Sequence, residues 1–205
     1  MTESVLIVGA GSGLSASLAR LCSSNGMKVV LAARDIEKLQ DLKKEIGANT
    51  IKCDATKIKS VTNLFKKTDK IIGVPNLVIY NPSKSLGGSI VDLDPQKAFE
   101  AINITSYGGF LVSQQAAKRM LKKKRGSIFF TGATASIKGF PNSSVFAMGK
   151  FGLRGLAQSL ARELHPQNIH IGHFIIDGGI GHENYGSYKT IHPDEIAKVY
   201  LQFHN

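Results

Sequence analysis

The sequence predicts a doubly wound α/β fold in three layers, a parallel sheet with helices on both faces. Strand-length apolar runs alternate from end to end with helix-length stretches whose apolar residues recur every three or four positions. The strand-length runs are continuously apolar, which is typical of strands buried on both faces. A glycine-rich turn follows the first run and leads directly into a helical pattern. We therefore expect a single domain over residues 1–205, with parallel strands in the order 3-2-1-4-5-6.

The strands expected along the chain are the apolar runs. In order they are Val5–Val8, Val29–Ala33, Thr50–Cys53, Leu77–Tyr80, Ser127–Thr131 and Ile169–Ile176. Helical spacing lies between them, as in Leu14-Leu18-Leu21 and in the series Leu153-Leu156-Leu160-Leu164. No internal repeat, low-complexity tract or linker interrupts this alternation, so a second domain is not expected.

The charge balance is strongly basic, with 26 Lys and Arg against 15 Asp and Glu and a net charge of +11. The densest cluster runs from Lys118 to Arg125. A basic patch can bind nucleic-acid phosphates, but no aromatic residue interleaves with this one to stack on bases. We interpret it as the solvated end of a helix that stops before Gly126, where cations complement the helix dipole. No nucleic-acid partner is therefore expected.

The remaining composition favours a cytoplasmic protein. No apolar run approaches the ~18 residues of a membrane span, so no membrane association is expected. No basic leader precedes the first apolar stretch. Cys22 and Cys53 lack the spacing of a metal or redox site, which fits small core residues in a reducing compartment.

The glycine-rich turn after the first expected strand carries the clearest binding motif. The turn and the start of the helix read Gly9-Ala10-Gly11-Ser12-Gly13-Leu14-Ser15. Glycines permit a tight turn and let the backbone approach a pyrophosphate at a helix N-terminus. The strict Gly-x-Gly-x-x-Gly pattern fails from Gly9 and starts too late from Gly11, whereas Gly9-x-x-x-Gly13-x-Ser15 fits, with serine in place of a third glycine. A plain turn would need no ligand, but its position between strand and helix favours a dinucleotide site.

The second expected strand ends in Ala33-Arg34-Asp35. An acidic residue at this tip would accept the ribose 2′-hydroxyl of NAD, whereas an arginine can pair with the 2′-phosphate of NADP. Ala33 lacks the acid and Arg34 supplies the cation, although a shift of one residue would place Asp35 at the tip. Arg34 could also form an ordinary surface ion pair. We expect NADP as the cofactor, with NAD possible.

Further motifs follow the later strands in order. They are Cys53-Asp54-Ala55, Asn81-Pro82-Ser83, Asn103 within Ala101-Ile102-Asn103-Ile104, Phe146-Ala147-Met148-Gly149-Lys150 and Asp177-Gly178-Gly179-Ile180. With the glycine turn, they resemble the short-chain dehydrogenase/reductase family over essentially the whole chain. The resemblance implies a Rossmann-type fold and an NAD(P)-dependent oxidoreductase that acts by hydride transfer on a small carbonyl or alcohol compound. The cofactor-binding residues it implies are Gly9, Gly11, Ser12, Gly13, Leu14, Arg34, Asp54, Ala55, Asn81, Pro82, Lys150, Gly178 and Ile180.

The catalytic set that the resemblance implies is altered. Lys150 matches the lysine that binds the nicotinamide ribose and lowers the pKa of a tyrosine, and Asn103 matches the asparagine that carries a proton-relay water. The tyrosine position, four residues before the lysine and on the same helix face, is Phe146. The serine position falls on Ala133, or on Thr134 if the register shifts by one. Both groups that would hydrogen-bond a substrate carbonyl are thus replaced, unless Thr134 substitutes for the serine.

This replacement leaves two interpretations open. Loss of a positioned proton donor costs about 10²–10⁴-fold in rate, so hydride transfer need not be abolished. The candidate donors are Lys150 as a charged group, Thr134, Ser144, Tyr107 or a water held by Asn103. The alternative is a non-catalytic NADP(H)-binding or sensing protein on the same fold, in which an apolar residue faces the cofactor.

The resemblance also implies a homodimer through the helices expected over residues 103–121 and 144–164. Phe110, Met120 and Phe151 look exposed on these helices, which supports burial against a partner. They could instead pack on the chain's own sheet.

The end of the chain departs from the family, whose members usually continue into a seventh strand. Here the sequence stops at Asn205, after a helix opened by Pro193, so we expect no seventh strand in the sheet. The chain is either short by nature or truncated. The loop from Gly181 to Thr190 is short for a substrate lid, and His182 within it is a candidate for catalysis or an ordinary loop residue.

Overall fold

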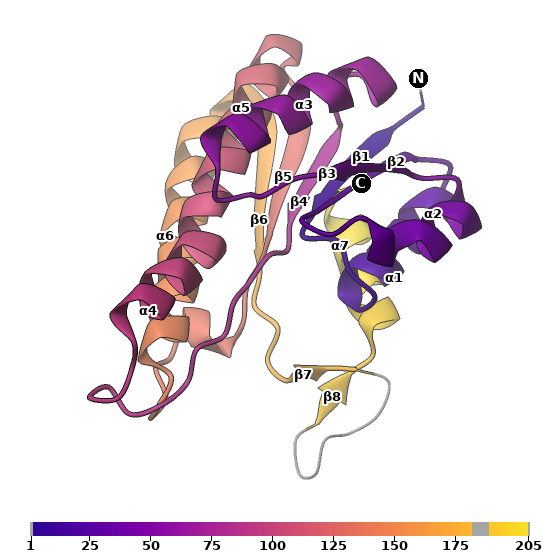
Figure 1. The fold of residues 1–205 in the computed structure, drawn as a ribbon. Coiled ribbons are helices and arrows are strands. Elements are labelled where there is room, and N and C mark those ends of the chain that lie inside the picture. The colour runs from indigo at the N-terminus through magenta and orange to yellow at the C-terminus, as the bar shows by residue number, and fades with distance from the viewer. Residues whose placement is uncertain (1, 182–188, 205) are drawn as a thin grey trace.

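The computed structural model, which describes residues 2–181 and 189–204, contains a parallel sheet between two helical layers (Figure 1). The main strands are β1 (Ser4–Val8), β2 (Lys28–Ala33), β3 (Asn49–Lys52), β4 (Leu77–Tyr80), β5 (Gly126–Thr131) and β6 (Ile169–Phe174). They form a six-stranded sheet in the order β3-β2-β1-β4-β5-β6, with every pair parallel. The predicted fold and strand order are confirmed, and no seventh strand joins the sheet within the described ranges.

Helices cover both faces of this sheet. They are α1 (Leu14–Ser24), α2 (Gln40–Ile46), α3 (Ile58–Ile72), α4 (Pro95–Ile102), α5 (Gly108–Lys123), α6 (Ser144–Leu164) and α7 (Pro193–His204), with short 3₁₀ turns at Glu37–Leu39, Thr134–Ser136 and His165–Gln167. In Figure 1, α3, α5 and α6 cover one face, while α1, α2 and α7 cover the other. Two hydrophobic cores result, one under each helical layer.

Strand β1 shows how a continuously apolar run serves both cores. Leu6 and Val8 pack in the core under α3, α5 and α6, whereas Val5 and Ile7 pack in the core under α1, α2 and α7. Since successive side chains of a strand point to opposite faces, both faces have to be apolar. All the main strands run in one direction, so the turns that follow them gather at one edge of the sheet.

The helix expected over residues 103–121 begins differently from an α-helix. A π-helical turn spans Asn103–Tyr107, and α5 follows it without a break. The chain packs so closely on the sheet here that a Cβ on Gly108 would collide with the Tyr80 side chain. The Tyr80 hydroxyl donates a hydrogen bond to the carbonyl of Ile104, inside the π turn. Such turns widen the helix locally and are frequent at functional sites.

Two further details correct or extend the sequence prediction. Met120 is buried (0% exposed), not exposed, because its side chain packs beneath the backbone of Gly126, where an added Cβ would lie 2.6 Å from Sδ. After β6, a separate two-stranded ribbon pairs β7 (Gly179–Ile180) with β8 (Thr190–Ile191) in parallel. The sequence did not predict this short ribbon.

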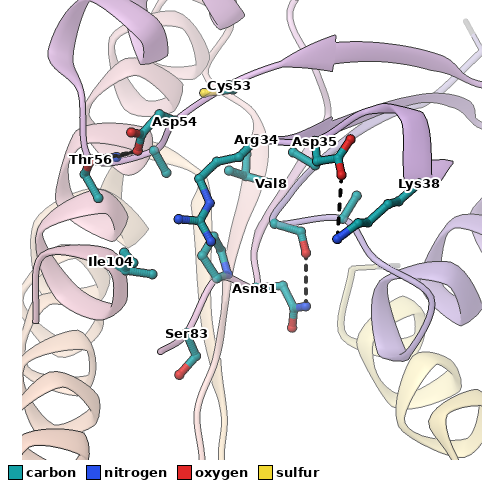
Figure 2. A pocket seen from close by; sticks show the side chains of 15 residues that line it. Val8, Arg34, Asp35, Lys38, Cys53, Asp54, Thr56, Asn81, Ser83 and Ile104 are labelled. Carbon is teal, nitrogen blue, oxygen red and sulfur yellow. Dashed lines mark hydrogen bonds and ion pairs between the residues drawn. The ribbon is translucent and has the colours of Figure 1, made fainter. Parts of the chain in front are cut away.

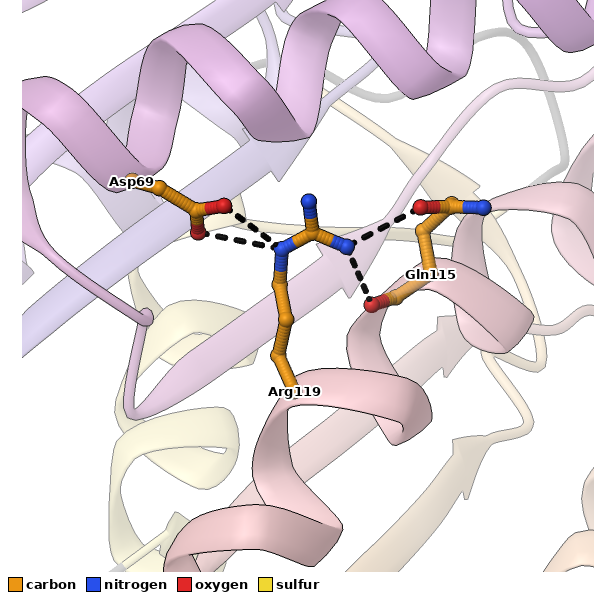
Figure 3. Close-up of polar contacts among 3 residues, drawn as sticks. All are labelled: Asp69, Gln115 and Arg119. Atoms are coloured by element: carbon orange, nitrogen blue, oxygen red, sulfur yellow. Dashed lines mark hydrogen bonds and ion pairs between the residues drawn. The ribbon is translucent and has the colours of Figure 1, made fainter.

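The basic cluster at the end of α5 includes one cation with a structural role. The Arg119 guanidinium donates from Nε to both carboxylate oxygens of Asp69, at 3.0 and 2.8 Å, and from Nη1 to the backbone carbonyl and the side chain of Gln115 (Figure 3). It also lies 5.1 Å from the centroid of the Phe65 ring. Arg119 thus ties α5 to α3, while Lys122 and Lys123 stand in the last turn of α5, as expected for a helix end.

Candidate cofactor and catalytic site

The glycine turn connects β1 to α1 and is closed by tertiary contacts. Gly9 has φ of 80°, a conformation that favours glycine, and an added Cβ would lie 2.6 Å from Pro82. The N–H groups of Gly9 and Ala10 both donate to the carbonyl of Ala32, at 2.9 and 3.0 Å. By contrast, a Cβ on Gly11 would meet nothing within 4 Å. The protein itself therefore requires glycine at position 9, while the space over Gly11 is open.

Ser15, at the position of a third glycine, has a role that the sequence did not reveal. Its hydroxyl donates to the carbonyl of Gly9 at 3.1 Å and accepts from the side-chain amide of Asn81 at 2.8 Å. Asn81 also reaches the Gly9 carbonyl at 3.5 Å. Ser15 thereby joins the turn after β1 to the turn after β4.

An open cleft of about 410 Å³ lies at this edge of the sheet (Figure 2). Its lining includes most of the expected adenine and ribose contacts together with the turn after β4: Gly9, Arg34, Asp54, Ala55, Asn81 and Pro82. The other predicted cofactor residues are not among its lining residues: Gly11, Ser12, Gly13, Leu14, Lys150, Gly178 and Ile180. The cleft is therefore built mainly from the tips of β1, β2, β3 and β4.

Arg34 and Asp35 differ in their surroundings. Figure 2 shows the Arg34 guanidinium reaching into the middle of the cleft. Asp35 is paired with Lys38, with 3.6 Å between Oδ2 and Nζ. Within the described residues no carboxylate forms an ion pair with Arg34.

Asp54 is fixed at the tip of β3. Burial acts to raise the pKa of this carboxyl, but hydrogen bonds from the Thr56 hydroxyl (2.7 Å) and backbone N–H (3.0 Å) outweigh it and lower the pKa. Lys57 and Arg34 add smaller attractive contributions. Asp54 is thus held as an anionic acceptor beside Arg34.

Lys150 is the residue on which the predicted catalytic set depends. It lies on α6 with only 3% of its surface exposed, and its Nζ donates to the carbonyl of Thr131 at 2.9 Å. Burial lowers the pKa of Lys150 to about 8. Phe146, one turn earlier, places its ring centroid 5.6 Å from Nζ. The helix spacing predicted from the sequence therefore brings Phe146 and Lys150 together.

The loop after β5 carries the residues at the serine position. The backbone N–H of Ala133 donates to the Ser136 hydroxyl at 3.1 Å. Thr134 donates its hydroxyl to Asp177 at 2.5 Å, and its N–H to the carbonyl of Ile176 at 3.2 Å. The Thr134 hydroxyl proton is thus already directed to a carboxylate.

The other expected donors lie in diverse surroundings. Asn103 opens the π turn, which packs against α6 through a hydrogen bond of 2.6 Å from Ser106 to the carbonyl of Gly149. Tyr107 is exposed and stacks on Phe110. The Ser144 hydroxyl is buried without a hydrogen-bond partner in the part of the chain that is described. His182 lies outside the described residues.

His173 is a neighbour of this site that the sequence did not single out, since it stands in the apolar run of β6. Its ring packs against Gly132, where an added Cβ would lie 2.5 Å from the imidazole. Burial, followed by the positive charges of Lys150 and Arg154, lowers the pKa of His173 to about 4. Its buried Nε2 has no hydrogen-bond partner among residues 2–181 and 189–204.

The described part of the chain contains neither a membrane-spanning helix nor a cluster of metal ligands. Each of its helices is too short or too polar to cross a bilayer. Its His, Cys, Asp and Glu side chains form no group of three or more that could hold a metal ion.

The shape and chemistry of the cleft fit a nicotinamide dinucleotide. Open space over a glycine turn at a helix N-terminus suits a pyrophosphate, Asp54 offers an acceptor, and Arg34 offers a cation. Lys150 lies beyond this cleft on α6, where a sugar hydroxyl could replace or join its carbonyl partner. These features define a dinucleotide-binding protein of the doubly wound class.

Comparison with known proteins specifies the family. The family model described as short chain dehydrogenase matches residues 3–180. The chain is 25% identical to the 3-oxoacyl-[acyl-carrier-protein] reductase of Bos taurus over 83% of its own length and 73% of that protein. The crystal structure of a short-chain dehydrogenase from Rhodopseudomonas palustris is 32% identical, with a TM-score of 0.86 over 98% of this chain and 90% of that one.

The chain therefore belongs to the short-chain dehydrogenase family, and its class is that of NAD(P)-dependent oxidoreductases. The fold also matches an actinorhodin polyketide ketoreductase crystallised with NADPH, at a TM-score of 0.92 over 100% of this chain and 90% of that one. The identity there is 20%, so that likeness concerns the fold alone.

Proposed function

We propose that this protein is an NADP(H)-dependent oxidoreductase that interconverts a small carbonyl compound and its alcohol without a catalytic tyrosine. The observation that carries the proposal is a buried Lys150 next to Phe146, in a chain whose cleft contains the open glycine turn. The nicotinamide cofactor, when bound, supplies or accepts the hydride. The protein then has to hold the reactants together and move one proton.

The residues proposed to hold the cofactor are those implied by the sequence. They are Gly9, Gly11, Ser12, Gly13 and Leu14 for the pyrophosphate, Arg34 for the 2′-phosphate, Asp54 and Ala55 for the adenine, Asn81 and Pro82 beside the turn, and Lys150, Gly178 and Ile180 toward the nicotinamide. The preference for NADP rests on Arg34, which faces the cleft while Asp35 is paired with Lys38.

The proposed substrate class is supported by the name of one sequence relative, the 3-oxoacyl-[acyl-carrier-protein] reductase of Bos taurus. That name specifies the reduction of a ketone, which is the reaction that we propose for the cleft and Lys150 of this chain.

The wider setting is also part of the proposal. We propose that the chain acts as a single NAD(P)-binding domain over residues 1–205, in the cytoplasm, as a homodimer through α5 and α6. Support for the dimer comes from Phe110 and Phe151, which are 42% and 45% exposed. Both lie on the helices that the family resemblance assigns to the interface, where a partner would remove them from water.

Phe146→Tyr tests the function directly. A phenol at this position would lie beside the Lys150 ammonium, which favours the ionised form and suits proton exchange. Reduction of a carbonyl panel, followed by NADPH oxidation, should rise by up to about 10²-fold. Phe203→Tyr, the same change on the exposed face of α7, is the matched control and should leave the rate unchanged.

A small effect of Phe146→Tyr, with measurable turnover by the native protein, would support an alternative proton donor that already performs the role. Tight NADPH binding with no turnover by either protein would reject the enzyme and leave a cofactor-binding or sensing protein.

A further inference from the structure

Lys150 has the surroundings of a group that exchanges protons rather than of a permanent cation. Its Nζ is buried and its hydrogen bond goes to a neutral acceptor, the Thr131 carbonyl, at 2.9 Å. No carboxylate forms an ion pair with it in the described ranges, and burial is the cause of its lowered pKa. Burial without an anionic partner disfavours the charged form of an ammonium, so the group loses its proton more easily than in water.

The groups that face Lys150 from neighbouring elements add no negative charge. Arg154 stands one turn later on α6, and His173 on β6 has its pKa lowered first by burial and then by both cations. On the far side of Thr131, the Tyr200 hydroxyl from α7 donates to Oγ1 at 2.9 Å. Burial raises the pKa of Tyr200, so this phenol stays neutral. Lys150 is therefore the group in this cluster whose proton is most easily released near neutral pH.

The residues at the family's tyrosine position and next to its serine position are less suited to the task. The Phe146 ring cannot exchange a proton, and the Thr134 hydroxyl already donates to Asp177 at 2.5 Å. The Lys150 Nζ lies 5.6 Å from the centroid of the Phe146 ring, the side chain that stands where the family carries its tyrosine.

Building on the proposed function, we propose that Lys150 is itself the general acid and base of the reaction. In reduction, the carbonyl carbon receives a hydride from the reduced cofactor, and the carbonyl oxygen takes a proton from the Lys150 ammonium. The product is the alcohol, and Lys150 is left as a neutral amine that regains a proton from solvent. In oxidation the amine accepts the hydroxyl proton while the carbon loses the hydride.

Two physical effects favour this assignment. A proton donor is most effective when its pKa lies near the operating pH, and burial brings Lys150 to about 8. A positive charge in a site sheltered from water also stabilises the negative charge that develops on the carbonyl oxygen. A residue that only anchors the ribose needs a positive charge and hydrogen-bond donors, and an arginine has both. An arginine therefore distinguishes the anchoring role from the proton-transfer role.

The test compares Lys150→Arg with Lys150→Met. Arginine keeps the positive charge but does not lose its proton in this pH range. We expect Lys150→Arg to bind NADPH in calorimetry and to lower kcat for carbonyl reduction by roughly 10²-fold or more. Lys150→Met should lose both affinity and turnover. Lys59→Arg, on the surface of α3, is the matched control and should retain the native rate.

A second measurement does not depend on turnover. In protein labelled with ¹³C-lysine, the Cε resonance of Lys150, assigned by its loss in Lys150→Arg, should titrate near pH 8. The native kcat for reduction should decline as the pH rises through the pKa of Lys150. In that measurement the relevant pKa is the one in the complex with bound cofactor. A titration midpoint at the ordinary lysine value of about 10.4 would overturn the proposal.

The outcomes distinguish failure of the proton role of Lys150 from failure of the proposed oxidoreductase function. Native turnover that survives in Lys150→Arg would overturn the proton role of Lys150 but leave the oxidoreductase intact. Absence of turnover in the native and the Phe146→Tyr proteins, with NADPH bound, would overturn the proposed function and the proton role together.

Discussion

Arg34 and Asp35 are adjacent residues from which opposite effects on cofactor choice are expected. The Asp35 carboxylate is paired with Lys38, and the Arg34 guanidinium reaches into the cleft. Both residues line the cleft, and Lys38 offsets the charge of Asp35, so we expect the tip of β2 to act toward a ligand mainly as a cation. A cation favours the cofactor that carries an additional phosphate.

Arg34→Ala should abolish most of the preference for NADP. A hydrogen bond to a charged group is worth about 1.5–3 kcal/mol, so NADP affinity should fall roughly 10- to 100-fold while NAD affinity changes little. Calorimetry with both nucleotides measures the difference, with Lys44→Ala on α2 as the control. Equal affinity of the native protein for NAD and NADP would show that Arg34 does not contact the phosphate.

At this scale the sequence could predict positions but not partners. Helix periodicity places Phe146 and Lys150 on one face of α6, as found. It cannot show that Lys150 bonds the Thr131 carbonyl or that Ser15 links Gly9 to Asn81, because those atoms meet only after β4 and β5 have joined the sheet. For the same reason, His173 gave no signal within its apolar strand.

The turn between β1 and α1 is the element that most constrains the sequence. Gly9→Ala should destabilise the fold by roughly 1–3 kcal/mol, because φ is 80° and the new Cβ would lie 2.6 Å from Pro82. Gly11→Ala is the matched control, since its Cβ would meet nothing within 4 Å. Urea unfolding compares the two variants.

The same pair separates folding from binding. Gly11→Ala should retain native stability but weaken NADPH binding, since its methyl group would fill space proposed for the pyrophosphate. Equal unfolding midpoints for Gly9→Ala and Gly11→Ala would contradict the constraint assigned to Gly9.

Element boundaries were predictable where local pattern alone determines them. The helix at 144–164 matches α6, and β4 matches its apolar run. The π turn at Asn103–Tyr107 was not predictable, because it accompanies the close approach of the helix to Tyr80, a tertiary contact. Two-residue strands such as β7 are too short to show periodicity.

For the molecule as a whole, the distribution of apolar side chains bears on assembly. Met120 was expected on the surface and is buried, since it fills space beneath Gly126. Phe110 on α5 and Phe151 on α6 remain exposed, and Figure 1 shows these helices in one outer layer. The layer therefore presents apolar side chains that the chain's own core does not need.

Phe151→Glu should weaken the proposed dimer. Burying an unpaired carboxylate and losing an aromatic contact would each oppose association. A loss of about 2 kcal/mol of binding free energy at such a contact raises the dissociation constant of the dimer roughly 30-fold. Sedimentation equilibrium can measure this change. Phe203→Glu places the same change on α7, where Phe203 is 57% exposed, and should leave the assembly unchanged. A native protein that sediments as a monomer at micromolar concentration would reject the dimer, and equal effects of the two variants would move the interface away from α6.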